Sequence, residues 1–215
     1  MFKIILKNSL INIYLILYNN SNIKDIMNPF KKFNMWFNLA KKNHPFDHTA
    51  FALGTENKGE PHIRMVLLKL IMEDGFVFFT NLNSNKGSHF KRNKNLSMCF
   101  YWESIHKQIR IVGKGSVVND EISDKYFGSR PRGSQIGAWA SDQSSLIKSF
   151  SHLKQKEKKF EKKFEGFNVP RPDYWVGIKI EPKQFEFWQQ GDFRLHRREV
   201  YFLKKNVWQS KLLSP

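Results

Sequence analysis

Three side chains that could bind an anion stand two residues apart in the segment 185–198, FEFWQQGDFRLHRR. Arg194, His196 and Arg198 share one parity, so in an extended strand they would project from the same face. Burying such donors is costly unless something anionic meets them. Trp188 stands just before them, and a planar ring beside fixed cations suits an aromatic phosphate. The alternative is a solvated edge strand, whose charges only discourage aggregation.

The same segment predicts the elements that hold these side chains. Phe185 and Phe187 alternate with Glu186 and Trp188, which is the period of a β-strand. The following QQGD sequence predicts a turn, in which Gly191 is free to adopt a positive φ. The cations would then lie on the strand that returns from this turn.

Residues 129–145, SRPRGSQIGAWASDQSS, form a second donor-rich segment. A polar loop is usually only solvated. Here Ile136 and Trp139 would anchor the loop against the body of the protein, and an anchored loop that contains arginine is a good phosphate cradle. The donors in this segment are Arg130, Arg132, Ser134, Gln135, Ser141, Gln143, Ser144 and Ser145.

A third anion site is predicted in residues 81–93, where a loop with Ser84, Asn85, Lys86 and Gly87 opens a short helix. Backbone N–H groups and the helix dipole favour an anion at such a point, although most such loops merely cap a helix. The common nucleotide motifs are absent. Glu60 stands where a P-loop needs lysine, and the glycines at 113 and 115 lack the third glycine of a dinucleotide fingerprint.

The elements that must position these segments are mostly strands. Apolar runs follow one another without long intervening helices, which favours an antiparallel barrel over a βαβ sheet. An Asp74-Gly75 hairpin joins two of the runs. The predicted strands are 49–56, 62–73, 75–81, 95–103, 107–118, 174–189 and 193–213. Helices are expected at 28–42, with Asn28 as the N-cap and an apolar face at helical spacing (Phe30, Phe33, Trp36, Phe37 and Ala40), and at 119–128, capped by Asn119 or Asp120. An amphipathic spacing predicts a further helix between Leu146 and Phe167.

Three blocks in this order resemble the pyridoxamine 5'-phosphate oxidase family. They are RMVLLK (64–69), KYFGSRPRGSQIGAWASDQSS (125–145) and the tryptophan followed by RLHRR (188–198), and the resemblance extends from about Asn28 to Pro215. It implies a mainly β fold with flanking helices, the FMN-binding split β-barrel, usually as a homodimer with the cofactor at the subunit interface.

The resemblance also implies roles for individual residues. FMN would contact Arg64, Met65, Val66, Leu67, Leu68, Lys69, Phe79, Thr80, Asn85, Lys86, Gln108, Gln143, Ser144, Trp188 and Arg198. The substrate phosphate would meet Lys69, Tyr126, Arg130 and Ser134, while Arg194, Leu195 and His196 would face the pyridine ring. Arg194 and His196 are the expected catalytic residues, for orientation and proton management. No metal site is expected.

Three positions depart from the family pattern. Asn85 stands where an arginine commonly precedes the lysine, which removes one charged contact to the FMN phosphate, worth about 1.5–3 kcal/mol. Phe79 replaces a frequent tyrosine and loses only a hydroxyl. Arg197 stands at a usually acidic or amide position.

The activity that the resemblance implies is oxidation of pyridoxamine or pyridoxine 5'-phosphate to pyridoxal 5'-phosphate, with dioxygen reduced to hydrogen peroxide. One alternative is another split-barrel flavin reductase or FMN-binding protein without this substrate. A second alternative is a basic nucleic-acid-binding protein, because the chain has 36 Lys and Arg against 19 Asp and Glu. We expect neither a nucleic-acid nor a membrane partner, since much of the charge fits solvated faces.

Length and cysteine content bound the organisation of the chain. At 215 residues, one domain from 27 to 215 is expected, preceded by an irregular extension, 1–26, whose apolar run is too short to span a bilayer. Cys99 is the single cysteine, which excludes an internal disulfide and a cysteine-rich zinc site. Cysteine poverty fits a reducing cytoplasm.

Overall fold

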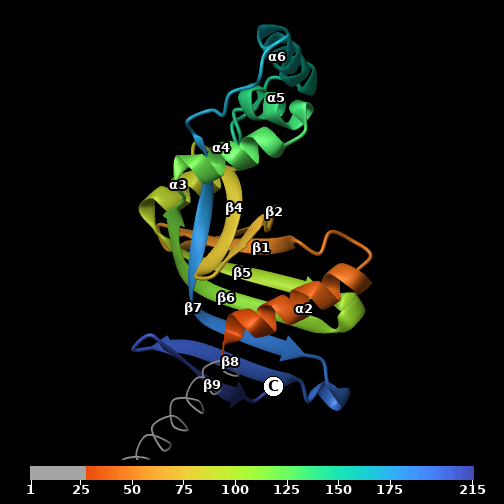
Figure 1. Ribbon diagram of the computed structural model, residues 1–215, viewed down its shortest axis with the longest axis vertical. Helices are drawn as coiled ribbons and strands as arrows, with labels where there is room; N and C mark the ends of the chain where they lie inside the picture. Colours follow the sequence, from red (N-terminus) through yellow and green to blue (C-terminus); the bar gives the residue numbers. More distant parts are fainter. Residues whose placement is uncertain (1–27) are drawn as a thin grey trace, which may run out of the picture. The chain divides into compact units, whose positions relative to one another are not determined.

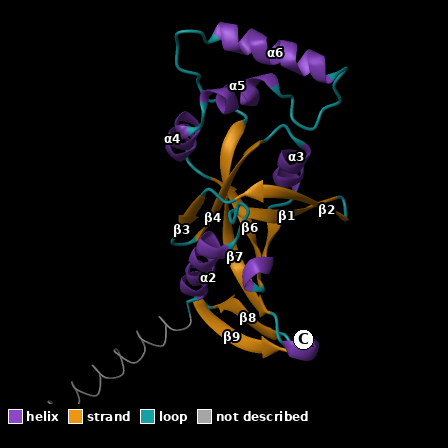
Figure 2. Ribbon diagram, turned by 90° about the vertical axis from the view of Figure 1, so that its right-hand side faces the viewer, coloured by secondary structure: helices purple, strands orange, loops and turns teal. Residues whose placement is uncertain are grey.

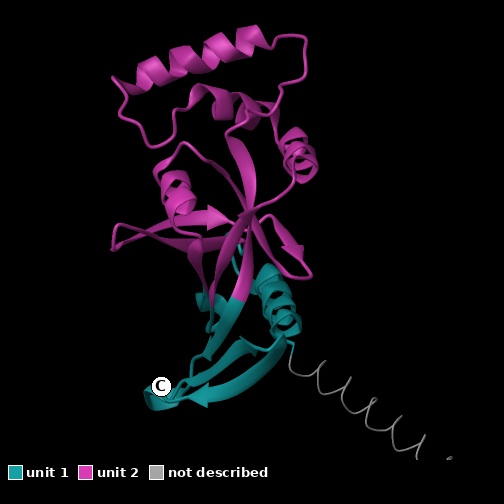
Figure 3. Cartoon of the chain, turned by 90° about the vertical axis from the view of Figure 1, so that its left-hand side faces the viewer, with its two compact units in different colours: residues 1–48, 101–110, 183–215 teal, residues 49–100, 111–182 magenta. Residues whose placement is uncertain are grey.

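The computed structural model describes residues 28–215, and the predicted extension 1–26 lies outside the described residues. The chain forms two compact units (Figure 3). The larger unit comprises residues 49–100 and 111–182. The smaller unit comprises residues up to His48 together with 101–110 and 183–215.

The strands of the larger unit are paired antiparallel where their register is defined. β1 (Ala50–Asn57) pairs with β2 (Glu60–Leu67) and with β5 (Asn95–Trp102). β4 (Gly75–Asn81) pairs with β3 (Leu70–Met72) and with β7 (Trp175–Gln189). With β6 (Lys107–Val117) the strand order is β2-β1-β5-β6-β7-β4-β3 (Figure 1). The expected mainly β fold with flanking helices is therefore confirmed.

The pattern of burial explains why these segments form strands. β1 alternates buried and half-buried residues, as a strand with one face on a core should. β4 is buried at nearly every position, so both of its faces are covered. The core of this unit is rich in phenylalanine, with Phe51, Phe76, Phe78 and Phe100 at 1% exposure or less.

The helices of the larger unit are α3 (Asn85–Arg92), α4 (Asp120–Ser129), α5 (Arg132–Ala140) and α6 (Phe150–Lys163). Each of them except α5 begins at a side-chain cap. Ser84 Oγ accepts from the N–H of Gly87 at the start of α3, and Asn119 Oδ1 accepts from that of Ile122 at the start of α4. The expected helix starts in both segments are confirmed.

Three expectations for the larger unit are wrong. The predicted strand 62–73 is broken after Leu67. The N–H of Leu68 donates to the carbonyl oxygen of Thr49, just before β1, whereas the N–H of the next residue, Lys69, donates to that of Val77 on β4. The donor-rich loop 129–145 contains a helix, α5, which packs on α6. Helix α6 is also shorter than the apolar spacing predicted, and Leu146 is fully exposed.

The smaller unit combines α2 (Pro29–Asn43) with β8 (Arg197–Lys204) and β9 (Val207–Leu213), which pair antiparallel (Figure 2). Asn28 caps α2, and Phe33, Trp36 and Ala40 are its buried face, as the spacing predicted. The ring of Trp36 meets that of Phe187 edge-on at 5.2 Å. Short 3-10 turns lie at Glu103–Ile105 and Asp192–Arg194.

The connection between β7 and β8 differs from the extended strand that was expected. Arg194 lies in the turn Asp192–Arg194, so only Arg198 of the three predicted cations is on β8. Gly191 has φ −130°, and the left-handed residues are Phe193 (φ 51°) and Arg194 (φ 67°). Gly191 is needed for space, because a Cβ there would lie 2.2 Å from the carbonyl oxygen of Leu195.

Candidate active site

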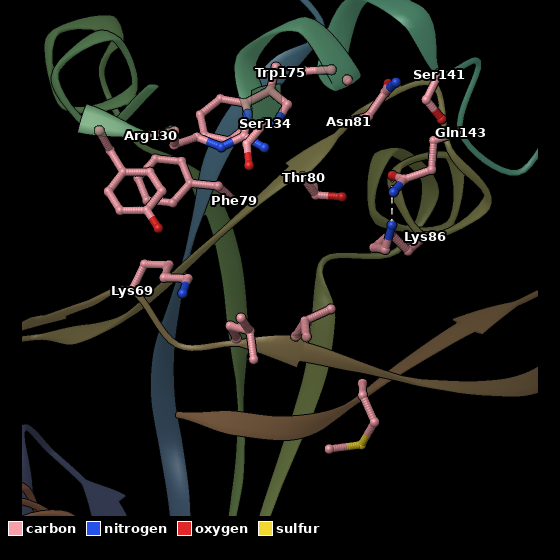
Figure 4. A pocket seen from close by; sticks show the side chains of 16 residues that line it. Lys69, Phe79, Thr80, Asn81, Lys86, Arg130, Ser134, Ser141, Gln143 and Trp175 are labelled. Carbon is pink, nitrogen blue, oxygen red and sulfur yellow. Dashed lines mark hydrogen bonds between the residues drawn. The ribbon is translucent and has the colours of Figure 1, made fainter. Parts of the chain in front are cut away.

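A cavity of about 490 Å³ lies within the larger unit (Figure 4), a volume typical of small-molecule sites. It opens among the ends of β2 and β4 and helices α3, α4 and α5. The cavity is lined by most of the ligand-binding residues of this unit that the family resemblance implied. They are Met65, Val66, Leu67, Lys69, Phe79, Thr80, Lys86, Tyr126, Arg130, Ser134 and Gln143. The structure therefore brings together side chains from three separate stretches of the sequence, 65–69, 79–86 and 126–143.

The break between β2 and β3 places Lys69 in the cavity. In an ideal strand Arg64 and Lys69 would point to opposite faces. Lys69 follows the break and lines the cavity, whereas Arg64 does not line it. Arg64 Nη1 donates to the carbonyl oxygen of Leu53 at 3.1 Å and to Thr55 Oγ1 at 2.7 Å. Its guanidinium is thereby held against β1, while burial lowers its pKa.

Lys86 projects from the first turn of α3 (Figure 4). Its Nζ donates to Gln143 Oε1 at 2.9 Å and lies 3.3 Å from Ser84 Oγ. Both partners are neutral, so neither compensates the ammonium charge. Burial, and then the charge of Arg64, lower the pKa of Lys86 to about 8.

Arg130 follows the C-terminus of α4 and reaches the cavity beside Tyr126 and Ser134. Its Nη1 is buried without a hydrogen-bond partner. Burial lowers the pKa of Arg130, with Tyr126 opposing the shift, and burial raises the pKa of the Tyr126 phenol. A buried donor without a partner is costly unless a ligand meets it.

No acidic side chain neutralises this group of cations. Among residues 28–215, no carboxylate lies within ion-pair distance of Arg64, Lys69, Lys86 or Arg130. Tyr126 and Phe79 form a parallel stacked pair at 4.1 Å in the wall of the same cavity. The arrangement fits a ligand that is both anionic and aromatic. Within the described part of the chain, no cluster of acidic, His and Cys side chains could hold a metal ion.

Some predicted ligands of the larger unit lie outside the cavity lining. Leu68 is buried in the core, Asn85 is exposed at the start of α3, and Ser144 is exposed with φ 75° in the loop after α5. Two donors of the predicted phosphate loop are engaged elsewhere. Arg132 donates to carbonyl oxygens at the end of α6, and the amide of Gln135 donates to three carbonyl oxygens around the end of α4.

The remaining predicted residues belong to the smaller unit: Gln108, Trp188, Arg194, Leu195, His196 and Arg198. The rings of Trp188 and His196 lie 4.7 Å apart, and His196 Nδ1 is 3.3 Å from the backbone nitrogen of Gly191. Arg194 and Leu195 are exposed. The structure thus brings Trp188 and His196 together and leaves the guanidinium of Arg194 open to solvent.

Arg198 is held on two sides within the smaller unit. Its Nε donates to Glu186 Oε1 at 2.9 Å, and its Nη1 donates to the carbonyl oxygen of Ser214 at 2.9 Å. Glu186 is buried and also accepts from Arg110 Nη1 at 3.1 Å. One carboxylate therefore orients two arginines.

Sequence reasoning missed several residues of the cavity wall: Asn81, Gly137, Ala138 and Trp175. Ser141, a donor of the predicted phosphate loop to which the family resemblance gave no role, also lines the cavity. Trp175 was treated only as the start of a strand, and no spacing in the sequence connects it with Arg130. Trp175 and Arg130 come into contact only when the chain is folded.

Comparison with known proteins agrees with the geometry. The profile described as pyridoxamine 5'-phosphate oxidase matches residues 40–164, and that described as the pyridoxine 5'-phosphate oxidase C-terminal dimerisation region matches 175–215. The chain belongs to the pyridoxamine 5'-phosphate oxidase family. The relatives of this family include a pyridoxine/pyridoxamine 5'-phosphate oxidase of Zymomonas mobilis, 43% identical over 87% of this chain and 98% of that protein.

Other members of the pyridoxamine 5'-phosphate oxidase family show the same similarity. The enzyme of that name from Aliarcobacter butzleri is 45% identical over 90% of this chain and 93% of its own length. Among solved structures, PhzG from Burkholderia lata, in complex with tetrahydrophenazine-1-carboxylic acid, has a TM-score of 0.83. It is 27% identical and covers 88% of this chain and 93% of its own. The expected split-barrel fold is thereby confirmed. None of the helices described in residues 28–215 is long and apolar enough to cross a membrane.

Proposed function

We propose that this protein is an FMN-dependent oxidase that converts pyridoxamine or pyridoxine 5'-phosphate to pyridoxal 5'-phosphate and reduces dioxygen to hydrogen peroxide, as a homodimer. The observation that carries the proposal is the cavity in which Lys69, Lys86 and Arg130 meet aromatic side chains, with no acidic residue in its lining among residues 28–215. The similarity to enzymes named for this activity supports it over most of the chain.

The residues present fit the two phosphorylated groups that the activity requires. Lys86, with Thr80 and Gln143 beside it, offers an ammonium, a hydroxyl and an amide at the N-terminal turn of α3, a suitable place for the FMN phosphate. Buried Thr80 Oγ1 has no hydrogen-bond partner, which is a further free donor in this wall. Lys69, Tyr126, Arg130 and Ser134 offer two cations and two hydroxyls for the substrate phosphate.

Bound FMN would supply the two-electron acceptor for the C4' carbon of the substrate and would return those electrons to dioxygen. The protein side chains bind, orient and manage protons. The phosphate ligands would fix one end of the substrate, which sets the distance of the other end from its reaction partner. Arg194 and His196 remain the proposed groups for orientation of the pyridine ring and for proton transfer.

A flavin reductase or FMN carrier of the same fold is the alternative. The Arg130, Tyr126 and Ser134 set argues against it, because FMN alone has one phosphate and Lys86 already offers a place for it.

The test is an aerobic assay of FMN-loaded protein with each vitamer, in which pyridoxal 5'-phosphate and hydrogen peroxide are quantified. Ammonia should appear with the amine substrate only. Arg130→Met should raise KM for the phosphorylated substrate, whereas Arg132→Met, whose guanidinium caps α6, should not. A protein that binds FMN and forms no aldehyde would favour the alternative, and one that binds no FMN would exclude both.

A further inference from the structure

The guanidinium of Arg130 lies over an aromatic ring (Figure 4). Its Cζ is 4.8 Å from the ring centroid of Trp175 and 5.4 Å from that of Phe127. Both distances are within the range of cation–π attraction, which is strongest for tryptophan. None of the ion pairs among residues 28–215 includes Arg130, so the ring contacts are what orient this charge.

Trp175 is itself fixed in place by the hydrophobic cluster of the larger unit. It is 7% exposed and packs with Phe127, Ile136, Phe164 and Val169. Its ring is parallel to that of Phe79 within 8°, at 5.1 Å, and meets that of Phe127 edge-on at 5.1 Å. A ring held on several sides cannot rotate freely, so it presents a constant face to the guanidinium.

The backbone around Trp175 is also anchored. Arg171 Nη1 donates to the carbonyl oxygen of Trp175 at 2.8 Å, and the same guanidinium forms ion pairs with Asp120 and Asp124 on α4. Arg130 follows the last turn of that helix, where the amide of Gln135 donates to its carbonyl oxygen at 3.0 Å. The backbone of Trp175, which carries the ring, and the backbone of Arg130 are therefore both anchored to α4.

An aromatic ring and a carboxylate hold an arginine with different consequences. A carboxylate partner would neutralise the guanidinium and compete with an anionic ligand. A ring fixes its direction and leaves its charge and its N–H groups available, and Nη1 of Arg130 is indeed buried without a partner. The arrangement suits a residue that must bind phosphate strongly once it arrives.

We infer that Trp175 is a positioning residue for Arg130, and that its ring thereby sets the preference of the enzyme for phosphorylated over unphosphorylated substrate. This inference rests on the proposed function, in which Arg130 contacts the substrate phosphate. Trp175 acts through the guanidinium and takes no part in the oxidation itself.

The experiment compares wild type, Trp175→Leu, Trp175→Tyr and Trp175→Phe with pyridoxamine 5'-phosphate and with pyridoxamine. Trp175→Leu should raise KM for the phosphorylated amine about 10-fold, within the range of a desolvated cation–π contact, and leave kcat unchanged. The kcat/KM for pyridoxamine and the dissociation constant of FMN should change by less than about 2-fold. Tyrosine and phenylalanine should restore part of the preference, tyrosine more than phenylalanine.

Trp139→Leu is the matched control. Trp139 packs on Phe160 and Phe164 in the same cluster, and its Nε1 donates to the carbonyl oxygen of Pro170. The cation over its ring is Lys163, whereas the rings under Arg130 are those of Trp175 and Phe127. It should lower the stability of the protein and leave the substrate preference unchanged. In an Arg130→Met background, Trp175→Leu should have almost no further effect on KM, because the group through which it acts is gone.

A binding measurement separates this inference from the proposed function. The dissociation constants of pyridoxal 5'-phosphate and of pyridoxal need no turnover, and their ratio should fall in Trp175→Leu. Absence of oxidase activity in wild type would contradict the proposed function alone. The positioning role would be overturned if Trp175→Leu weakened the binding of pyridoxal 5'-phosphate and of pyridoxal equally. It would also be overturned if the ratio of the two dissociation constants were unchanged in all three variants, Trp175→Leu, Trp175→Tyr and Trp175→Phe.

Discussion

The ammonium of Lys86 and the side-chain amide oxygen of Gln143 lie 2.9 Å apart, one on helix α3 and the other in the loop after α5. The pair joins two segments that are distant in sequence at one edge of the cavity. Since the amide is neutral, the lysine keeps an uncompensated charge there. Burial and the nearby charge of Arg64 lower the pKa of Lys86 to about 8.

The affinity for FMN should therefore fall as the pH rises through about 8. Below this pH Lys86 is charged and can bind a phosphate; above it the free protein must take up a proton when FMN binds. The dissociation constant should increase by up to about tenfold per pH unit until the pKa of the bound state is reached. Quenching of FMN fluorescence by the apoprotein measures this constant.

Two variants isolate Lys86 from other titrating groups in that experiment. Lys86→Arg keeps its charge throughout the range and should bind FMN with little pH dependence. Lys86→Met should bind weakly at every pH. Parallel profiles for wild type and Lys86→Arg would show that a different group titrates.

Glu186 should be important for the stability of the smaller unit. Its buried carboxylate is bonded to Arg198 at 2.9 Å and to Arg110 at 3.1 Å. Glu186→Gln leaves both arginines without their anion and should lower the free energy of unfolding by about 1–3 kcal/mol in urea denaturation.

Glu181→Gln is the matched control on the same strand. Glu181 is half-exposed and lies 3.1 Å from Lys179, which keeps Asp74 as a second partner. Its loss should change the free energy of unfolding by less than about 1 kcal/mol. If Glu186→Gln and Glu181→Gln changed the free energy of unfolding equally, the buried ion pairs of Glu186 would not contribute more to stability than an exposed one.

Gly177 makes room for the aromatic wall of the cavity. It pairs with Phe79 across β7 and β4, and a Cβ at this position would lie 2.7 Å from Val118 Cγ2 and 2.8 Å from Phe79 Cε1. Gly177→Ala must displace the Phe79 ring, at a cost of about 1–3 kcal/mol, visible as a lower Tm. Gly133→Ala on helix α5 meets no atom within 4 Å and should be neutral or stabilise by up to about 1 kcal/mol. A Gly177→Ala protein with unchanged Tm would contradict the packing described.

Local signals predicted the elements whose ends are set by nearby residues. The Asn28 cap and apolar face of α2, the Asp74-Gly75 hairpin and the Asn119 cap of α4 all appear as expected. Helix α5 was missed because its polar surface resembles a loop, while contacts from Gln135 and Ile136 to other segments stabilise it. The left-handed Phe193 and Arg194 carry no glycine signal, so the geometry of that turn could not be foreseen.

The candidate site was predictable where local stretches of the sequence hold its residues. The blocks that hold Lys69, Lys86 and Arg130 are recognisable in sequence, and the structure places all three around one cavity. Trp175 was not predictable, because its contact with Arg130 depends on the packing of α4 against β7.

Arg194 should affect turnover more than the other arginines of its segment. Arg194→Ala is expected to lower kcat/KM at least about 10-fold, the range of a lost charged hydrogen bond, without changing the affinity for FMN. Arg197→Ala is the control. The guanidinium of Arg197 is exposed, and its ion pair with Glu199 is long, at 3.9 Å. Its kcat/KM should stay within about 2-fold of wild type. Similar losses in both variants would argue against a specific role for Arg194.

The central claim, that this chain oxidises a phosphorylated B6 vitamer through FMN, is tested most directly without dioxygen. FMN-loaded protein is mixed anaerobically with pyridoxamine 5'-phosphate in a stopped-flow instrument, and the flavin absorbance is followed. The proposed function predicts bleaching of the flavin, stoichiometric pyridoxal 5'-phosphate, and return of the colour when air is admitted. A flavin that stays oxidised in the presence of saturating substrate would contradict it.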